Sequence, residues 1–310
     1  MNIVVPVKTF SKNNILVNEL LENFPNSKVN TKGQVFNDKE LIEFIYGYDV
    51  MICGLEEIGG KLLKACPSIK LIVKYGVGLD NIDFNACKKY NVKVLFEKGV
   101  NKNSVAELTI GFMLSLNRNI YSTCAELKSN IWNKSGGSDL SNKTVGIIGV
   151  GNIGKQVIKL LKPFDCRILV NDVINQQEYY KKQNVEEVSK EELLKRSDII
   201  SVHTPLNAEM HHFFNRDKFQ LMHKDSILIN TARGSIIKTK DLIYVLENEY
   251  IKGAALDVYE EEPPFNLNLV HLSNLICTPH IGGNSIESIL AMGRSAINLI
   301  LQNRFTVIIK

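Results

Sequence analysis

The feature that most constrains the fold is the stretch TVGIIGVGNIGKQVIKLL, residues 144–161. A short apolar run leads directly into a glycine-rich turn and then into apolar residues at helical spacing, which predicts a strand, a phosphate-binding turn and a helix. Gly149, Gly151 and Gly154 have the G-x-G-x-x-G spacing. In this motif the first glycine makes the tight turn, the second lets a pyrophosphate approach, and the third lets helix and strand pack closely. The helix N-terminus adds N–H donors and a positive dipole end.

The glycine spacing alone is weak evidence, because it also occurs in ordinary packing turns. Its surroundings strengthen it. A strand at 143–148 precedes the turn, and a second strand at 167–170 ends at Asn171-Asp172. An acidic residue at this separation from the turn is placed to accept hydrogen bonds from an adenosine ribose. We therefore predict a dinucleotide-binding unit.

Length, charge and cysteine usage narrow the class of protein. A chain of 310 residues suits two α/β domains, each with its own core. Its 37 basic and 33 acidic side chains are spread along the sequence, so we expect no nucleic-acid partner. No segment has the ~18 apolar residues of a membrane span, and the N-terminus does not resemble a signal peptide, so we expect no membrane either. Six cysteines without a C-x-x-C pair indicate reduced thiols in a cytoplasmic protein.

Short apolar runs and amphipathic runs alternate along most of the chain, which is the pattern of parallel α/β sheets. In the first third we expect strands at 3–7, 50–53, 71–74 and 92–96, and helices at 13–24, 39–46, 60–66 and 82–90. After the glycine turn we expect strands at 167–170, 199–203, 226–230, 254–258 and 275–278. A last helix at 285–302 and a terminal apolar run at 305–309 belong to neither sheet by sequence order alone. Gly99 and the Gly282-Gly283 pair are candidate hinges between the two units.

The segment 103–119 predicts a long helix that is apolar around most of its circumference. Such a helix is buried on several sides, either between domains or between subunits. Because its apolar face is wider than one sheet needs, we favour a subunit interface and expect a homodimer.

Polar residues that follow the strands of the second unit are candidates for chemistry, because ligands bind at the carboxyl ends of parallel strands. Arg233, Glu262 and His280 each follow such a strand. Singly, they could be a surface arginine, part of a solvated acidic run and a structural histidine. Together they can converge: the arginine fork suits a substrate carboxylate, and a carboxylate beside an imidazole raises the pKa of the ring towards neutral pH. We expect no metal, because the adjacent His211 and His212 would point to different sides of a helix.

Several ordered motifs make the chain resemble the D-isomer-specific 2-hydroxyacid dehydrogenases. They are GVGNIG with Asp172, HTPLNAEM at 203–210, NTARG at 230–234, ALDVYEEEPP at 255–264 and TPHIGG at 278–283. The resemblance implies an α/β fold of two doubly wound parallel-sheet domains. A Rossmann NAD-binding domain at 100–283 would be inserted in a flavodoxin-like substrate domain at 1–99 and 284–310, so that the last helix returns to the first domain.

The resemblance also implies roles for the candidate residues. Arg233 would hold the substrate carboxylate and carbonyl, His280 would be the acid/base, and Glu262 would orient His280 and favour its charged form. The cofactor would be NAD. Its expected contacts are Gly149, Gly151, Asn152, Ile153, Gly154, Asp172, Thr204, Thr231, Ala232, Arg233, Asp257, His280 and Gly283.

The loop KYGVGLDNID, residues 74–83, looks like the substrate loop of the phosphoglycerate dehydrogenase branch, which implies Lys74, Val77 and Gly78 as substrate contacts. Lys74 stands where relatives often have an arginine, so a point charge replaces a planar fork. It could hold a second anionic group of the substrate, or it could merely end a strand in solvent.

The resemblance thus favours interconversion of 3-phosphoglycerate and 3-phosphohydroxypyruvate, as in serine biosynthesis, by a short form without the C-terminal regulatory domain of longer relatives. A glyoxylate, hydroxypyruvate or D-lactate-type 2-oxo acid reductase is the alternative within enzymes. An NAD(H)-sensing binding protein that resembles a corepressor is the alternative of another class.

Overall fold

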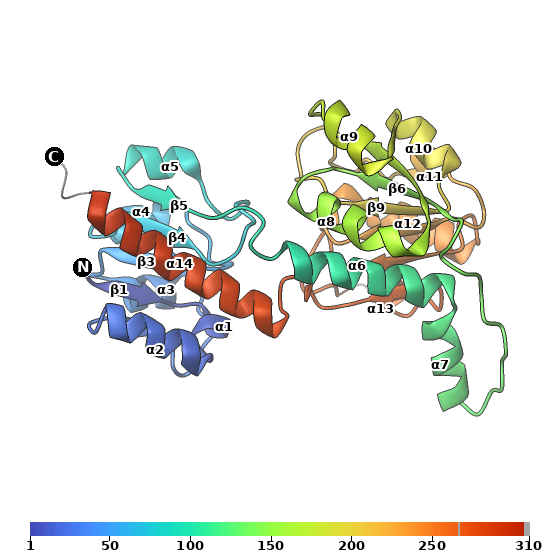
Figure 1. Ribbon diagram of the computed structural model, residues 1–310. Coiled ribbons are helices and arrows are strands. Elements are labelled where there is room, and N and C mark those ends of the chain that lie inside the picture. Colours follow the sequence, from blue (N-terminus) through green and yellow to red (C-terminus); the bar gives the residue numbers. More distant parts are fainter. Residues whose placement is uncertain (266, 307–310) are drawn as a thin grey trace. The chain divides into compact units, whose positions relative to one another are not determined.

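The computed structural model describes residues 1–265 and 267–306, which form two compact units (Figure 1). Unit 1 consists of Met1–Asn101 and the segment that begins at Gly283, and unit 2 is Lys102–Gly282. Each unit has its own parallel sheet and its own hydrophobic core. The chain therefore passes between the units at 101–102 and again at 282–283.

Unit 1 is built on five parallel strands in the order β2-β1-β3-β4-β5, the flavodoxin-like doubly wound arrangement. Its strands are β1 (Ile3–Val5), β2 (Lys28–Val29), β3 (Val50–Cys53), β4 (Leu71–Lys74) and β5 (Lys93–Leu95). Its helices are α1 (Lys8–Ser11), α2 (Asn14–Asn23), α3 (Asp38–Ile45), α4 (Gly60–Ala65), α5 (Phe84–Lys89) and α14 (Ile286–Thr306).

Both faces of this sheet are covered, as the unbroken apolar strands predict. Successive residues of β3 alternate between two cores: Val50 and Ile52 pack with α2 and α14, whereas Met51 and Cys53 pack with α3 and α4. The last helix, which sequence order left unassigned, thus lies on the sheet of unit 1. Most of the expected apolar run at 305–309 lies outside the described residues, since the description ends with α14 at Thr306.

Unit 2 has seven parallel strands in the order β12-β11-β10-β9-β6-β7-β8, which radiate in both directions from β6 as in a Rossmann fold. Its strands are β6 (Thr144–Ile148), β7 (Arg167–Asn171), β8 (Glu186–Glu187), β9 (Ile199–Val202), β10 (Ile227–Asn230), β11 (Gly253–Leu256) and β12 (Leu275–Cys277). Its helices are α6 (Lys102–Asn117), α7 (Ile120–Lys128), α8 (Asn152–Leu161), α9 (Gln177–Gln183), α10 (Lys190–Arg196), α11 (Arg216–Phe219), α12 (Thr239–Glu247) and α13 (Leu267–Val270), with 3-10 turns η1 (Lys162–Phe164) and η2 (Gly234–Ile236).

The apolar helix expected at 103–119 is α6, and much of its surface is used inside unit 2. Phe112 and Met113 are buried in one core with Val157 and Ile158 of α8. On the same helix, the buried Thr109 hydroxyl lies 3.3 Å from that of Thr231, at the end of β10. The width of the apolar face is therefore explained largely by packing within the chain.

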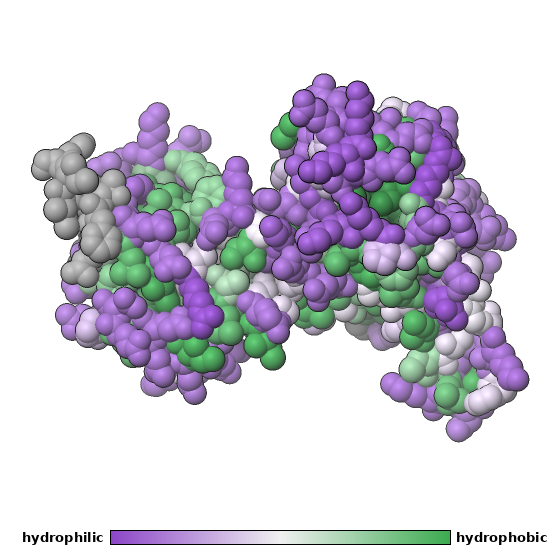
Figure 2. Space-filling view, in the orientation of Figure 1, coloured by the Kyte–Doolittle hydropathy of each residue, from purple (hydrophilic) through white to green (hydrophobic). Residues whose placement is uncertain are grey.

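Exposed apolar side chains gather instead on α7 and the segment after it. None of the residues of α7 is buried, and Ile120, Tyr121 and Leu127 are exposed. Ile131 and Trp132, which follow, are exposed as well. Figure 1 shows α7 extending away from the sheet of its own unit, and Figure 2 shows hydrophobic surface on this projection.

All six cysteines are free thiols. Cys53, Cys66 and Cys87 are buried, Cys166 and Cys277 are half-buried, and Cys124 is exposed. Within the described ranges, the helices lack the combination of length and apolar composition that crossing a bilayer requires.

Candidate active site

The glycine-rich turn between β6 and α8 has the geometry that its sequence predicts. Gly149 has φ +95°, and a Cβ there would lie 2.7 Å from the backbone of His203. A Cβ at Gly154 would lie 2.1 Å from the carbonyl oxygen of Gly149, so α8 approaches β6 this closely only because the residue is glycine. A Cβ at Gly151 would meet nothing within 4 Å, which leaves open space at the start of α8.

The start of α8 also offers hydrogen-bond donors. Gly151 is its N-cap and provides no side-chain hydrogen bond to the first turn, which begins at Asn152 and Ile153. Unsatisfied N–H groups and the positive end of the helix dipole together favour an anionic group such as a pyrophosphate.

Asp172 follows β7 and faces the same turn. Its Oδ2 accepts a hydrogen bond of 2.5 Å from the N–H of Val150, and its Oδ1 accepts one of 2.8 Å from the N–H of Ile174. Each carboxylate oxygen has a second lone pair. The carboxylate is thus fixed beside the turn and can still accept hydrogen bonds from a ribose diol.

His203 and Thr204 follow β9 on the other side of the turn. His203 Nε2 lies 2.9 Å from Ser201 Oγ, and burial lowers the pKa of the imidazole to about 3, so the ring is neutral. Within the described part of the chain, His203 Nδ1 and Thr204 Oγ1 are buried without a hydrogen-bond partner. We expected Thr204 at this site but not His203, although both begin the HTPLNAEM motif. Two unpaired polar atoms beside a phosphate turn suit a polar ligand.

The imidazole of His280 is paired with Glu262. His280 Nδ1 lies 2.7 Å from Glu262 Oε2, and Glu262 Oε1 accepts a second hydrogen bond from the N–H of Tyr259 at 3.1 Å. A ring nitrogen that faces a carboxylate carries the proton, so Nδ1–H donates to Glu262, and Nε2 is the ring nitrogen through which a proton can be exchanged with a ligand. The bond from Glu262 raises the pKa of His280, partly opposed by burial, with smaller effects of Asp257 (raising) and Arg233 (lowering).

Glu262 is held in its charged form. Partial burial opposes ionisation, but the hydrogen bond and charge of His280, together with the N–H of Tyr259, lower the pKa of Glu262 below its ordinary value. Arg233 acts in the same direction. The pair therefore favours a carboxylate and an imidazolium next to each other.

The loop that carries His280 is anchored by Asp257, which is buried at the end of β11. Asp257 accepts hydrogen bonds from the Thr278 hydroxyl at 2.6 Å and from the N–H groups of Ile281 and Gly282, both at 2.7 Å. His280, between these anchors, has φ +53°, in the left-handed region that histidine adopts more readily than most residues. The buried carboxylate thus fixes the backbone on both sides of the imidazole.

Arg233 belongs to a compact loop after β10. Asn230 closes it, donating from Nδ2 to the carbonyl of Arg233 at 2.8 Å and accepting from the N–H of Ala232 at 3.0 Å. The next residue, Gly234, touches the loop of Glu262, since a Cβ there would lie 1.8 Å from the carbonyl carbon of Tyr259. The structure therefore brings Arg233, Glu262 and His280 to one edge of one sheet, as the strand ends predict.

The other expected cofactor residues of unit 2 follow the same strands. Thr231 and Ala232 are buried beside Arg233 after β10. The expected contact Gly283 lies in unit 1, where the chain leaves unit 2.

The expected substrate residues lie in unit 1. One of the two interpretations of Lys74, that it ends a strand in solvent, is wrong. Lys74 is buried at the end of β4, so it does not end a strand in solvent. Its ammonium donates to the carbonyl of Gly54 and to Asn81 Oδ1, the latter at 2.7 Å. Val77 and Gly78, in the loop that follows, are half-buried.

Asn81 connects this lysine to a second loop, because its Nδ2 donates to the carbonyls of Gly54 and Glu56. The Glu56 carboxylate accepts from the N–H of Gly54, and burial raises its pKa. A cation and a shielded carboxyl group thus share the carboxyl end of β3 and β4.

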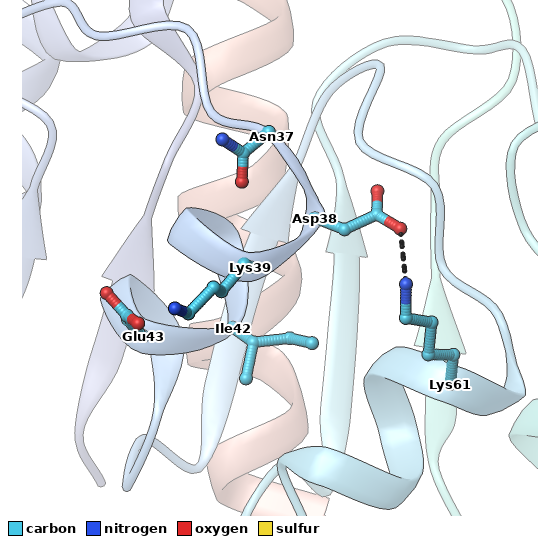
Figure 3. A pocket seen from close by; sticks show the side chains of 6 residues that line it. All are labelled: Asn37, Asp38, Lys39, Ile42, Glu43 and Lys61. Atoms are coloured by element: carbon cyan, nitrogen blue, oxygen red, sulfur yellow. Dashed lines mark hydrogen bonds and ion pairs between the residues drawn. The ribbon is translucent and has the colours of Figure 1, made fainter.

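A cavity of about 720 Å³ in unit 1 contains none of these residues. It lies beside α3 and α4, and Figure 3 shows Lys61 and Asp38 paired at its edge, 2.9 Å apart. The side chains around it are mostly solvated charges, which gives it no chemistry in common with the predicted site.

We predicted that His211 and His212 point to different sides of a helix, and this is wrong. They lie in a turn and not on a helix, and their ring centroids are only 4.0 Å apart. His212 has φ +52° and its Nε2 lies 2.5 Å from Glu260 Oε1. The turn residue in a left-handed conformation brings the rings together, and the pattern of adjacent histidines could not reveal this.

Comparison with known proteins agrees with this geometry. Residues 110–282 match the family described as D-isomer specific 2-hydroxyacid dehydrogenase, NAD binding domain. A glyoxylate reductase from Thermofilum pendens is 36% identical over 272 residues, which cover 84% of this chain and 80% of that protein. The chain belongs to the D-isomer-specific 2-hydroxyacid dehydrogenases.

Two further relatives bear on cofactor and substrate. A D-3-phosphoglycerate dehydrogenase from Methanocaldococcus jannaschii is 38% identical over 259 residues, 82% of this chain and 49% of that protein, so the chain spans about half its length. An NAD-dependent formate dehydrogenase from Staphylococcus aureus, solved in complex with NAD, matches with a TM-score of 0.85 and 28% identity over 98% of this chain and 96% of that one. This D-2-hydroxyacid dehydrogenase therefore uses NAD, and the open space at Gly151 and the unpaired atoms of His203 and Thr204 suit that cofactor.

Proposed function

We propose that this dehydrogenase interconverts a 2-oxo acid and its D-2-hydroxy acid through Arg233, Glu262 and His280. The observation that supports these roles is the 2.7 Å contact between His280 Nδ1 and Glu262 Oε2, within the influence of the Arg233 charge. A ring held by one nitrogen, with its pKa raised, is suited to exchange a proton through the other nitrogen.

The bound nicotinamide supplies or accepts the hydride, so the chain itself must hold the substrate and exchange one proton. In the reduction, His280 Nε2–H gives its proton to the carbonyl oxygen while the carbonyl carbon gains the hydride, and the imidazole is left neutral. Arg233 binds the carboxylate and draws charge from the carbonyl. Glu262 stabilises the imidazolium before the transfer and keeps the ring oriented after it.

The cofactor would be held by the predicted residues of unit 2. The N–H groups at Asn152 and Ile153 would meet the pyrophosphate, and Asp172 the adenosine ribose. Thr204, Thr231 and Asp257 would lie around the nicotinamide half, with His203 as an addition that only the structure suggests.

For the substrate, we propose 3-phosphohydroxypyruvate and 3-phosphoglycerate. Lys74, a buried cation at the end of β4, supports a second anionic group on the substrate. The similarity to the phosphoglycerate dehydrogenase of M. jannaschii agrees with this choice. The ammonium already donates to Gly54 and Asn81, so a phosphate would join these acceptors or replace one of them.

The two protein acceptors of Lys74 are also the observation that favours a second candidate, an unphosphorylated acid such as glyoxylate or hydroxypyruvate. If Lys74 keeps both of its protein acceptors, its role is to fix the substrate loop, and the substrate needs no second anion. The similarity to a glyoxylate reductase over most of both chains agrees with this candidate.

The test is NADH oxidation by the purified protein with phosphohydroxypyruvate, hydroxypyruvate, glyoxylate and pyruvate. We expect the highest kcat/KM for phosphohydroxypyruvate. A higher value for any unphosphorylated acid would contradict the phosphate assignment, and no oxidation with any of the four would contradict the proposed reaction.

We also propose that the enzyme is a homodimer in the cytoplasm. The free thiols agree with a reducing compartment. The exposed Ile120, Tyr121, Leu127, Ile131 and Trp132 support an interface that includes α7, rather than α6 alone as expected from sequence. By light scattering, we expect the wild type to be a dimer. The Trp132→Ser variant should shift the equilibrium towards the monomer. A monomeric wild type would contradict the interface.

A further inference from the structure

A second carboxylate–imidazole pair lies near the first, at the start of the same acidic loop. Glu260 Oε1 accepts from His212 Nε2–H at 2.5 Å, and Glu260 Oε2 accepts from the N–H of Thr239, at the start of α12, at 2.7 Å. The side chains of Glu260 and His212 are about one third exposed. Both carboxylate oxygens are therefore bound, although the residue lies in a loop with solvent access.

His212 is itself attached to the loop of Arg233. Its backbone N–H donates to the carbonyl of Ser235 at 2.8 Å, two residues after Arg233. From the other side, Gly234 packs against the backbone of Tyr259 and Glu260, with the virtual Cβ 2.5 Å from the N of Glu260. The pair thus connects the loop that carries Arg233 with the loop that carries Glu262.

We propose that Glu260 and His212 are positioning residues for the reaction, a clasp that holds the Glu262 loop against the Arg233 loop. This inference rests on the proposed roles of Arg233, Glu262 and His280. In this proposal the clasp acts by keeping the Glu262 carboxylate at hydrogen-bond distance from His280, rather than by binding substrate or cofactor.

The loop that carries Glu262 needs a contact that restrains it. Glu260, Glu261 and Glu262 are all exposed, so they are not fixed by packing in the core of the sheet. An unrestrained backbone gains conformational freedom, which favours positions of Glu262 away from His280. Glu262 itself has the N–H of Tyr259 and the imidazole of His280 as hydrogen-bond partners. Glu260 adds two restraints from elements outside the loop.

Among the described residues, the titratable group next to the clasp is His211, whose ring centroid lies 4.0 Å from that of His212. Glu260 is bound by His212 and by the start of α12, and although burial opposes its ionisation, its hydrogen bonds and the His212 charge hold its pKa below the ordinary value. His280 is faced by Glu262, Asp257 and Arg233. A change at Glu260 can therefore reach His280 chiefly through the position of Glu262.

The experiment compares Glu260→Ala, His212→Ala and the double variant with the wild type, using the best substrate of the panel. For each single variant we expect kcat/KM to fall about tenfold, as for a displaced supporting group. We expect the double variant to fall no further, because both changes break one connection. The pH at which the reduction rate declines should move lower, because Glu262 then raises the pKa of His280 less. The Kd for NADH should stay within about twofold.

Glu191→Gln is the matched control, since it removes a carboxylate of α10 that is paired with Lys218 of α11 at 2.5 Å. It should leave both kcat/KM and the pH profile unchanged. Glu260→Gln keeps the acceptor for Thr239 and should retain more activity than Glu260→Ala. If Glu260→Ala does not fold, Glu260→Gln takes its place in the comparison.

The clasp is refuted if the single variants stay within about twofold of wild-type kcat/KM with an unchanged pH profile, or if their losses multiply in the double variant. Failure of the proposed reaction looks different: the wild type itself would be inactive, or His280→Asn would be as active as the wild type.

Discussion

Replacing His280 with asparagine separates proton transfer from loop structure. His280 has φ +53°, and asparagine is among the few residues that adopt this conformation readily. The asparagine amide can also donate to Glu262, which otherwise would lose its 2.7 Å partner. The substitution therefore removes the group that exchanges a proton and preserves the backbone and the carboxylate.

The expected loss of catalytic rate in His280→Asn follows from the role of His280 as general acid and base. A positioned general acid or base contributes about 10²–10⁴-fold to the rate, which at about 1.36 kcal/mol per tenfold corresponds to about 2.7–5.4 kcal/mol of transition-state stabilisation. In His280→Ala the same catalytic loss should come with a loss of stability of about 1–2 kcal/mol, because alanine is strained in the left-handed region. Asparagine should leave the free energy of unfolding nearly unchanged.

The assay is steady-state NADH oxidation at saturating 2-oxo acid, together with NADH titration by fluorescence and urea unfolding. We expect kcat of His280→Asn to fall at least 10²-fold, with little change in the Kd for NADH. A fall of less than about tenfold would refute His280 as the acid/base. Equal losses of NADH binding and kcat would assign the residue to the cofactor site instead.

Three further outcomes test the other assignments. Glu262→Gln removes the carboxylate that raises the pKa of His280, so this pKa should fall. Because reduction needs the protonated imidazole, the decline of the reduction rate with rising pH should move to lower pH. An unchanged pH profile would exclude the proposed Glu262–His280 pair. For the wild type, kcat/KM with NADH should exceed that with NADPH, because the Asp172 carboxylate repels a 2′-phosphate, and equal values would contradict this role. Lys74→Met should weaken binding of phosphohydroxypyruvate by about 1.5–3 kcal/mol and glyoxylate much less, whereas equal changes in KM for both acids would show that Lys74 only supports the loop.

The sequence by itself determined the parallel α/β architecture and the edge where the chemistry lies. The segment 144–161 forms strand, turn and helix because each step depends on neighbouring residues. Gly149 makes the predicted tight turn, Gly154 allows the predicted close packing, and Gly151 leaves open space at the start of α8. The strand ends also predicted that Arg233, Glu262 and His280 meet, because β10, β11 and β12 are adjacent and parallel. Neighbouring strand ends in one sheet cannot be far apart.

Sequence patterns missed elements that lack an apolar run. The edge strands β2 and β8 have only two residues each, a half-buried Lys28-Val29 pair and an exposed Glu186-Glu187 pair, so no hydrophobic alternation marks them. The helix α7 was not expected either, since it buries none of its residues and begins after the left-handed Asn119. In each case the element owes its position to neighbours in space and not to its own composition.

Only the tertiary structure decided which partner each polar group meets. Lys74 donates to Gly54, 20 residues earlier in the sequence, and is buried rather than solvated. Glu260 meets His212, 48 residues away, where a run of glutamates predicted only a solvated surface. Local spacing fixes how a strand or helix forms, but contacts between loops depend on how the connections fold over the sheet, and neighbouring residues carry no information about that path.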